Sequence, residues 1–91
     1  MKRVRVTVRG RVQGVGYRFG ASAAAAECGV SGWVRNTSDG SVEAEVEGEP
    51  AAVDAMLAWM SQGPATARVD GLDVADVVPT GVPGFRVLRD P

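Results

Sequence analysis

Residues 2–28 read KRVRVTVRGRVQGVGYRFGASAAAAEC. Valines alternate with polar residues over 2–9, which is the period-2 pattern of a half-buried strand. From Tyr17 to Cys28 the alanines recur at helical spacing, and Gly29 is placed to end the helix as a C-cap. The stretch therefore predicts a strand and a helix that are joined by a short, glycine-rich loop.

The rest of the chain carries the signals of four more strands and a second helix. Asp39-Gly40 is a strong hairpin signal, and Glu49-Pro50 puts an acid and a proline at the start of a helix. Gly71 interrupts the alternation of a later strand and indicates a bulge. The expected elements are strands at Ser31–Asn36 and Ser41–Glu47, a helix from Pro50 that includes Met60, a strand within Ala67–Val78 and a short strand at Phe85–Leu88.

This element order is β-α-β-β-α-β followed by a short strand, which is the split-βαβ, ferredoxin-like arrangement. We therefore predict an α+β sandwich in a single domain, residues 1–91, with two helices on one face of an antiparallel sheet. With a right-handed first crossover, the first two strands run parallel and the third lies between them. Their C-terminal ends then meet at one edge of the sheet.

The strand at Ser41–Glu47 alternates small apolar residues with acidic ones. The residues predicted to face inward are Val42, Ala44 and Val46. The glutamates of the other parity are Glu43, Glu45 and Glu47. We expect them to form a solvated acidic face rather than a metal site.

The composition excludes several classes of function. The chain has no histidine and one cysteine, Cys28, so zinc sites, internal disulfides and histidine-based triads are not expected. Ten basic residues face eleven acidic ones, which leaves no overall positive field to attract nucleic acid. No apolar run is long enough for a signal peptide or a membrane span, so we expect a cytoplasmic protein, and nothing demands more than a monomer.

A candidate anion site follows the first strand. In the loop Gly10–Arg18, three glycines allow positive φ and let several consecutive N–H groups point inward. The helix that begins there adds free N–H groups and its dipole, and Arg18 can place its guanidinium over the same anion. Such a site suits a phosphoryl group, or a phosphate or sulfate ion. Glycine spacing alone favours the alternative, a strand-to-helix connection without a ligand.

Other motifs fit less well. Gly14-x-Gly16 lacks the third glycine of a dinucleotide fingerprint, and the loop ends without the Gly-Lys-Ser/Thr of a Walker motif. Cys28 and Arg35 are one residue too far apart for a thiol phosphatase loop, so Cys28 is interpreted as a buried, inert side chain. Asn36-Thr37-Ser38 matches a glycosylation acceptor, which a cytoplasmic chain would not use.

Asn36 ends the second predicted strand at the same sheet edge. Two inter-strand spacings of about 4.8 Å separate this strand from the first, a gap that long side chains bridge. An asparagine at the junction of a strand and a turn is most often a turn former. Its expected place beside the loop makes Asn36 a candidate for catalysis.

Two motifs together resemble the signatures of the acylphosphatase family. The first is Gly10-Arg-Val-Gln-Gly-Val-Gly-Tyr-Arg18, and the second is Gly32-Trp-Val-Arg-Asn36 with Asp39-Gly-Ser-Val-Glu43. The resemblance implies a ferredoxin-like enzyme that hydrolyses acyl phosphates to a carboxylate and inorganic phosphate. Two features depart from it: Tyr17 stands where phenylalanine is more usual, and Gly20 loosens the first helical turn by about 1 kcal/mol relative to alanine.

The resemblance also implies a role for each matching residue. Arg18 becomes the phosphate-binding arginine, and Asn36 becomes the residue that positions the attacking water. The implied phosphate cradle is Val12, Gln13, Gly14, Val15, Gly16 and Tyr17. Thr37 is a candidate to steady Asn36, although a turn hydroxyl more often bonds its own backbone. No metal or cofactor is implied, because positioning and electrostatics supply most of the acceleration of phosphoryl transfer.

Two other functions stay open. One is a non-catalytic module of the same fold that binds RNA or a small effector on the open sheet face, although the chain has only five aromatic residues and a net charge of −1. The other is a fused regulatory domain of a larger maturation enzyme, although zinc-finger cysteines are not found before Pro91.

Overall fold

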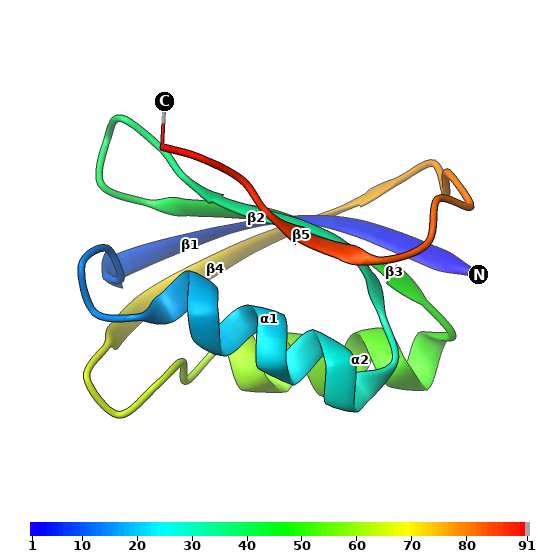
Figure 1. The fold of residues 1–91 in the computed structure, drawn as a ribbon, viewed down its shortest axis with the longest axis horizontal. Coiled ribbons are helices and arrows are strands. Elements are labelled where there is room, and N and C mark those ends of the chain that lie inside the picture. The colour runs from blue at the N-terminus through cyan, green and yellow to red at the C-terminus, as the bar shows by residue number, and fades with distance from the viewer. Residues whose placement is uncertain (91) are drawn as a thin grey trace.

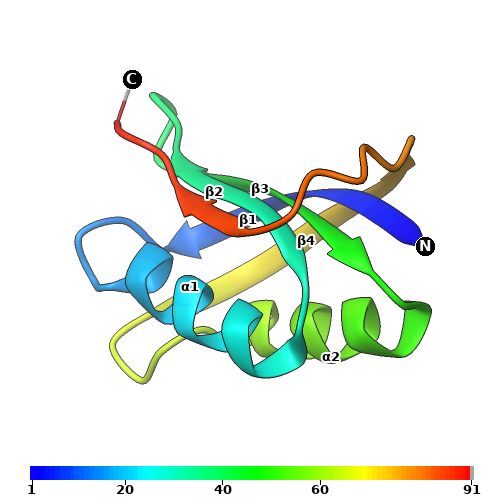
Figure 2. The same ribbon diagram turned by 45° about the vertical axis from the view of Figure 1, so that its right-hand side comes forward.

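The computed structural model describes residues 1–90, which form one five-stranded sheet with two helices packed beneath it (Figure 1). The elements are β1 (Lys2–Arg11), α1 (Tyr17–Cys28), β2 (Ser31–Asn36), β3 (Val42–Gly48), α2 (Pro50–Met60), β4 (Arg68–Val77) and β5 (Phe85–Val87). A turned view shows both helices on the same face of the sheet (Figure 2). The ferredoxin-like α+β fold predicted from the sequence is confirmed.

The sheet has the strand order β4-β1-β3-β2-β5. β3 pairs antiparallel with both β1 and β2, so these two strands run parallel to each other on either side of it, as predicted. β4 pairs antiparallel with the other edge of β1. The short β5 pairs in parallel with β2, which makes the sheet mixed at this edge. The C-terminal segment therefore runs alongside β2 in the same direction.

The core lies between the sheet and the two helices. The valines at every second position of β1 and the inward-facing valines of β3 are buried. Ala21 and Ala25 of α1 and Val53 and Met56 of α2 are buried as well. Val42, Ala44 and Val46 face this core, as predicted. Gly29 ends α1 in the left-handed conformation, and its N–H donates to the carbonyl of Ala25 at 2.9 Å.

A bulge in β4 lies beside Gly71, close to where the sequence predicted one. Arg9 pairs with Gly71 but Gly10 pairs with Val69, so Asp70 is the extra residue of β4. The two backbones approach closely here, because a Cβ on Gly10 would lie 2.1 Å from the carbonyl oxygen of Arg68. The pairing of β1 with β4 therefore shifts its register between Arg9 and Gly10, shortly before β1 ends at Arg11.

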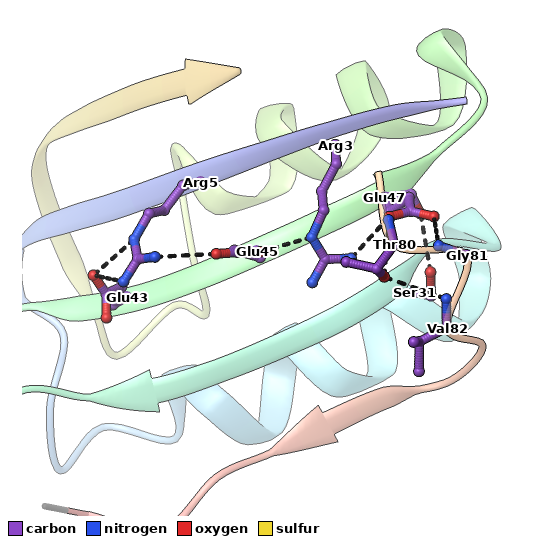
Figure 3. Close-up of polar contacts among 9 residues, drawn as sticks. All are labelled: Arg3, Arg5, Ser31, Glu43, Glu45, Glu47, Thr80, Gly81 and Val82. Carbon is purple, nitrogen blue, oxygen red and sulfur yellow. Dashed lines mark hydrogen bonds and ion pairs between the residues drawn. The ribbon is translucent and has the colours of Figure 1, made fainter. Parts of the chain in front are cut away.

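The prediction of a solvated acidic face on β3 is wrong. Arginines of the neighbouring strands lie opposite the three glutamates and form ion pairs with them, along the face of the sheet that the helices leave open (Figure 3). Glu47 is 2% exposed, and Arg3 is 6% exposed. The alternation identified the face correctly, but it carries no information on what the adjacent strands place there.

Glu47 also anchors the connection between β4 and β5. Its carboxylate accepts hydrogen bonds from Arg3 Nη1 at 2.9 Å and from the N–H groups of Thr80 and Gly81 at 2.7 and 2.9 Å (Figure 3). The hydrogen bond from the Thr80 amide is the largest cause of a lowered Glu47 pKa, with Arg3 and Gly81 adding to it against the opposing effect of desolvation. A buried charge is thus satisfied by donors from Arg3, Thr80 and Gly81.

Candidate active site

The strand register places Asn36 on the helix side of the sheet, beside the start of α1. Val8, Val42 and Asn36 lie in one row across β1, β3 and β2, and Val8 is fully buried against the helices. Residues directly opposite each other on paired strands share a face, so Asn36 points to the core side, and it is 7% exposed. A polar side chain therefore ends a row that is otherwise apolar.

The loop between β1 and α1 is bent by two glycines. Gly14 and Gly16 adopt left-handed backbone angles, with φ of 73° and 81°. Gly16 is the N-cap residue of α1, and no side chain within residues 1–90 caps this end of the helix. The first N–H groups of α1 are therefore free of side-chain acceptors, and this end of the helix carries the positive end of the dipole. Both features suit an anion.

Three contacts hold this loop in place. Val12 is buried in the core. Gln13 Nε2 donates to the carbonyl oxygens of Thr37 and Ser41, at 2.7 and 2.8 Å, which ties the loop to the turn between β2 and β3. Thr66 Oγ1 donates to the Val15 carbonyl at 2.6 Å from the segment after α2. The loop is therefore supported from both sides, an arrangement that the motif alone does not reveal.

Arg18 lies in the first turn of α1 and reaches toward β5. Its Nη1 donates to the Leu88 carbonyl at 3.0 Å and lies 2.8 Å from Asp90 Oδ1. The side chain of Arg18 is 28% exposed, and that of Asp90 is 62% exposed. The guanidinium therefore faces an anionic oxygen at the mouth of the site.

Asn36 contacts the same oxygen. Its Nδ2 donates to Asp90 Oδ1 at 3.1 Å, so one carboxylate oxygen lies within hydrogen-bond distance of both Arg18 and Asn36. Asn36 Oδ1 is buried and has no hydrogen-bond partner among residues 1–90. A buried acceptor without a donor is costly, so this oxygen is suited to a ligand or a bound water.

Tyr17 packs behind the loop and forms part of the cavity wall. Its ring is 1% exposed and packs against Trp59, with centroids 5.4 Å apart, and its hydroxyl donates to the Met60 carbonyl at 2.8 Å. Burial raises the pKa of Tyr17 well above its usual range, which keeps this donor protonated. Tyr17 thus joins the N-terminus of α1 to one of the last carbonyls of α2.

Thr37 supports the hairpin turn rather than Asn36. Its hydroxyl donates to Asp39 Oδ1 at 2.5 Å and lies 2.7 Å from the Ser41 hydroxyl, and none of its hydrogen bonds in the described chain reaches Asn36. Hydrogen bonds from the Ser41 hydroxyl, from Thr37 and from the Ser41 amide lower the pKa of Asp39 to about 2. The side-chain hydrogen bond that Asn36 makes is donated by its Nδ2 to Asp90 Oδ1.

A cavity of about 340 Å³ lies among these elements, within the range of small-ligand pockets. It brings together most of the residues singled out from the sequence, while the side chain of Gln13 turns to the hairpin. The lining residues are Val12, Gly14, Gly16, Tyr17, Arg18, Phe19, Asn36 and Val87.

Sequence reasoning missed the contribution of the C-terminal segment. It placed no acidic group near the loop, whereas Asp90 contacts both Arg18 and Asn36. Val87 and Phe19, both exposed, were missed as well. The parallel pairing of β5 with β2 brings this segment to the site, and a three-residue strand gives no sequence signal of its partner or direction.

The known proteins that resemble this chain agree on one family. A family model described as acylphosphatase matches residues 4–87. An acylphosphatase from Methylococcus capsulatus is 56% identical over 91 residues, which is 99% of this chain and 99% of the relative.

Solved structures agree with the sequence matches. The crystal structure of an acylphosphatase from Bacillus subtilis superimposes with a TM-score of 0.93 at 31% identity, covering 97% of this chain and 99% of that one. Full-length HypF, in a phosphate- and nucleotide-bound form, contains a similar unit: TM-score 0.89, 26% identity, 98% of this chain and 12% of that one.

Proposed function

Because the chain belongs to the acylphosphatase family and hydrolyses the carboxyl-phosphate bond of acyl phosphates, we propose that the cavity beside Arg18 and Asn36 is its active site. Arg18 and the loop Val12–Tyr17 bind the phosphoryl group, and Asn36 positions the attacking water. The protein works as a cytoplasmic monomer of one domain and needs no metal or cofactor. No helix within residues 1–90 has the length and apolar character that a membrane crossing requires.

The single observation that carries this proposal is the oxygen shared by Arg18 and Asn36. Asp90 Oδ1 lies 2.8 Å from Arg18 Nη1 and 3.1 Å from Asn36 Nδ2. A carboxylate oxygen carries negative charge, as the non-bridging oxygens of a phosphoryl group do, so Asp90 stands in for the substrate in this geometry. The two side chains are near enough to contact one phosphoryl group, which displaces Asp90 when it binds.

The free acceptor on Asn36 supports the assignment of the water. With Nδ2 directed at the anion, the buried and unpartnered Oδ1 is available to accept a hydrogen bond from a water molecule. The carboxylate of the substrate is a good leaving group, and phosphoryl transfer passes through a loose transition state. Orientation of the water and charge stabilisation by Arg18 therefore suffice, and a phosphoryl oxygen accepts the proton of the water.

The test is hydrolysis of acetyl phosphate and benzoyl phosphate with EDTA present. We expect Arg18→Gln to lower kcat/KM by about 10³, the scale of an arginine that stabilises a transferring phosphoryl group. Arg18→Lys should also be impaired, because lysine lacks the planar fork. Arg86→Gln, an exposed arginine on β5 that does not line the cavity, is the control. Wild-type rates in both Arg18 variants would place the site elsewhere.

A further inference from the structure

The cavity has an apolar rim that phosphoryl binding does not use. Phe19 directly follows Arg18 in the first turn of α1, lines the same cavity and is 82% exposed. Val87 of β5 lines it as well and is 47% exposed. A large exposed aromatic side chain beside a binding site is a common mark of ligand contact.

The helix geometry explains why Phe19 is exposed. Successive residues of an α-helix are about 100° apart around its axis. Tyr17 points into the core, so Phe19, two positions on, points away from it, toward the solvent. Arg18 lies between them in direction, and Arg18 and Phe19 both line the cavity.

The position of the rim fixes what it contacts. An acyl phosphate has a phosphoryl end and an acyl end, and Arg18, Asn36 and the loop take the first. The acyl end must then extend past the mouth of the cavity, where Phe19 and Val87 are the exposed apolar side chains. Neither side chain carries a hydrogen-bonding group or a charge. The rim therefore stabilises an apolar acyl group and does not compensate a charged acyl group for the loss of its hydration.

We propose that Phe19 and Val87 form an acyl-group subsite that favours acyl phosphates with an aromatic or other apolar acyl group over small or charged ones. This inference rests on the proposed function, because it takes the phosphoryl group to be held by Arg18. Aromatic rings pack against each other in offset or edge-to-face contact, so a benzoyl group gains from the Phe19 ring. An acetyl group is too small to cover it.

The test is the ratio of kcat/KM for benzoyl phosphate to kcat/KM for acetyl phosphate. The ratio is independent of the fraction of folded enzyme. We expect Phe19→Ala to lower it about tenfold, mainly through a higher KM for benzoyl phosphate, and Phe19→Leu to restore part of it. Val87→Ala should lower it less, because fewer apolar atoms are removed.

Val78→Ala is the matched control for Val87→Ala, since Val78 is 83% exposed and does not line the cavity. We expect it to keep the wild-type ratio. A ratio that stays within twofold of wild type in Phe19→Ala overturns the subsite, even when Arg18→Gln abolishes hydrolysis of both substrates. If Arg18→Gln still hydrolyses both substrates at wild-type rates, the proposed function itself is overturned, and the subsite with it.

Discussion

At the scale of single residues, the two ends of the Asn36 amide have different surroundings. Its Nδ2 contacts the anionic oxygen that Arg18 also contacts, and its Oδ1 is buried without a partner. In the proposed reaction, Nδ2 contacts the phosphoryl group in the ground state, whereas Oδ1 orients the water in the chemical step. The proposal therefore gives the two ends of the side chain roles at different stages.

Asn36→Ala tests this division. Loss of water positioning should lower kcat by about 10²-fold or more, because positioned groups of this kind contribute on that scale. KM should change much less, since Arg18 and the loop retain the phosphoryl group. Steady-state kinetics with benzoyl phosphate separates the two parameters. An effect confined to KM would assign Asn36 to binding alone.

Asp90→Asn tests whether the side-chain carboxylate of Asp90 competes with the substrate. Asp90 forms an ion pair with Arg18, and such partly exposed pairs are worth up to about 1 kcal/mol. Removing the charge should therefore tighten inhibition by inorganic phosphate by up to about fivefold. The inhibition constant for phosphate measures this. If kcat instead falls more than tenfold while phosphate affinity is unchanged, Asp90 acts as a base.

The two residues show what the sequence predicts well and what it does not. Asn36 lies in a motif of consecutive residues, and strand alternation assigns its face. Asp90 lies 72 positions after Arg18, and only the pairing of β5 with β2 brings them together. Contacts between segments so far apart depend on strand order and direction, which single-sequence patterns do not contain.

At the scale of elements, Gly20 of α1 lies against Trp59 of α2, where the sequence indicated only a loosened helix. A Cβ on Gly20 would lie 2.9 Å from Trp59 Cζ2. The ring of Trp59 is itself packed against Tyr17. Gly20 thus leaves room for the Trp59 ring between the two helices, a role that helix propensity does not reveal.

Gly20→Ala sets the gain in helix propensity against the steric contact with Trp59. Alanine gains about 1 kcal/mol of helix propensity, and overpacking against Trp59 costs about 1 to 3 kcal/mol. We expect a net loss of about 1 kcal/mol in the free energy of unfolding, measured by urea denaturation. Made in a Trp59→Leu background, the same substitution should stabilise the protein. Stabilisation in both backgrounds would show that Trp59 moves aside freely.

At the scale of the whole molecule, the open face of the sheet is held by paired charges. Glu43 accepts hydrogen bonds from Arg5 and Arg35. Glu47 accepts them from Arg3 and from the connection between β4 and β5 (Figure 3). Desolvation opposes ionisation of Glu43, but the two arginines outweigh it and lower its pKa. The pKa of Glu47 is lowered too.

These shifts predict a loss of stability in acid. A carboxylate with a lowered pKa in the folded state stabilises the fold fully above its unfolded pKa, about 4.3 for glutamate. That contribution disappears as the pH falls through the folded value. The free energy of unfolding should therefore decrease as the pH falls from about 5 to 3.

Glu47→Gln should be less stable than wild type at pH 7, and the difference should shrink in acid. Urea denaturation across this pH range measures both. Glu43 and Asp39 leave a residual slope in the variant, since their pKa values are also lowered. Glu27→Gln, on the exposed side of α1, is the control and should follow wild type. Parallel curves for wild type and Glu47→Gln would contradict the prediction.

The long strand β1 separates the two ends of the molecule. Its ten residues rise about 3.3 Å each, so Met1 lies on the order of 30 Å from the loop at Gly14 (Figure 1). Leu88 and Asp90, by contrast, lie beside Arg18. An electrode or bead coupled through Met1 would therefore present the mouth of the cavity to the bulk solution, whereas attachment near Asp90 would bury it against the support.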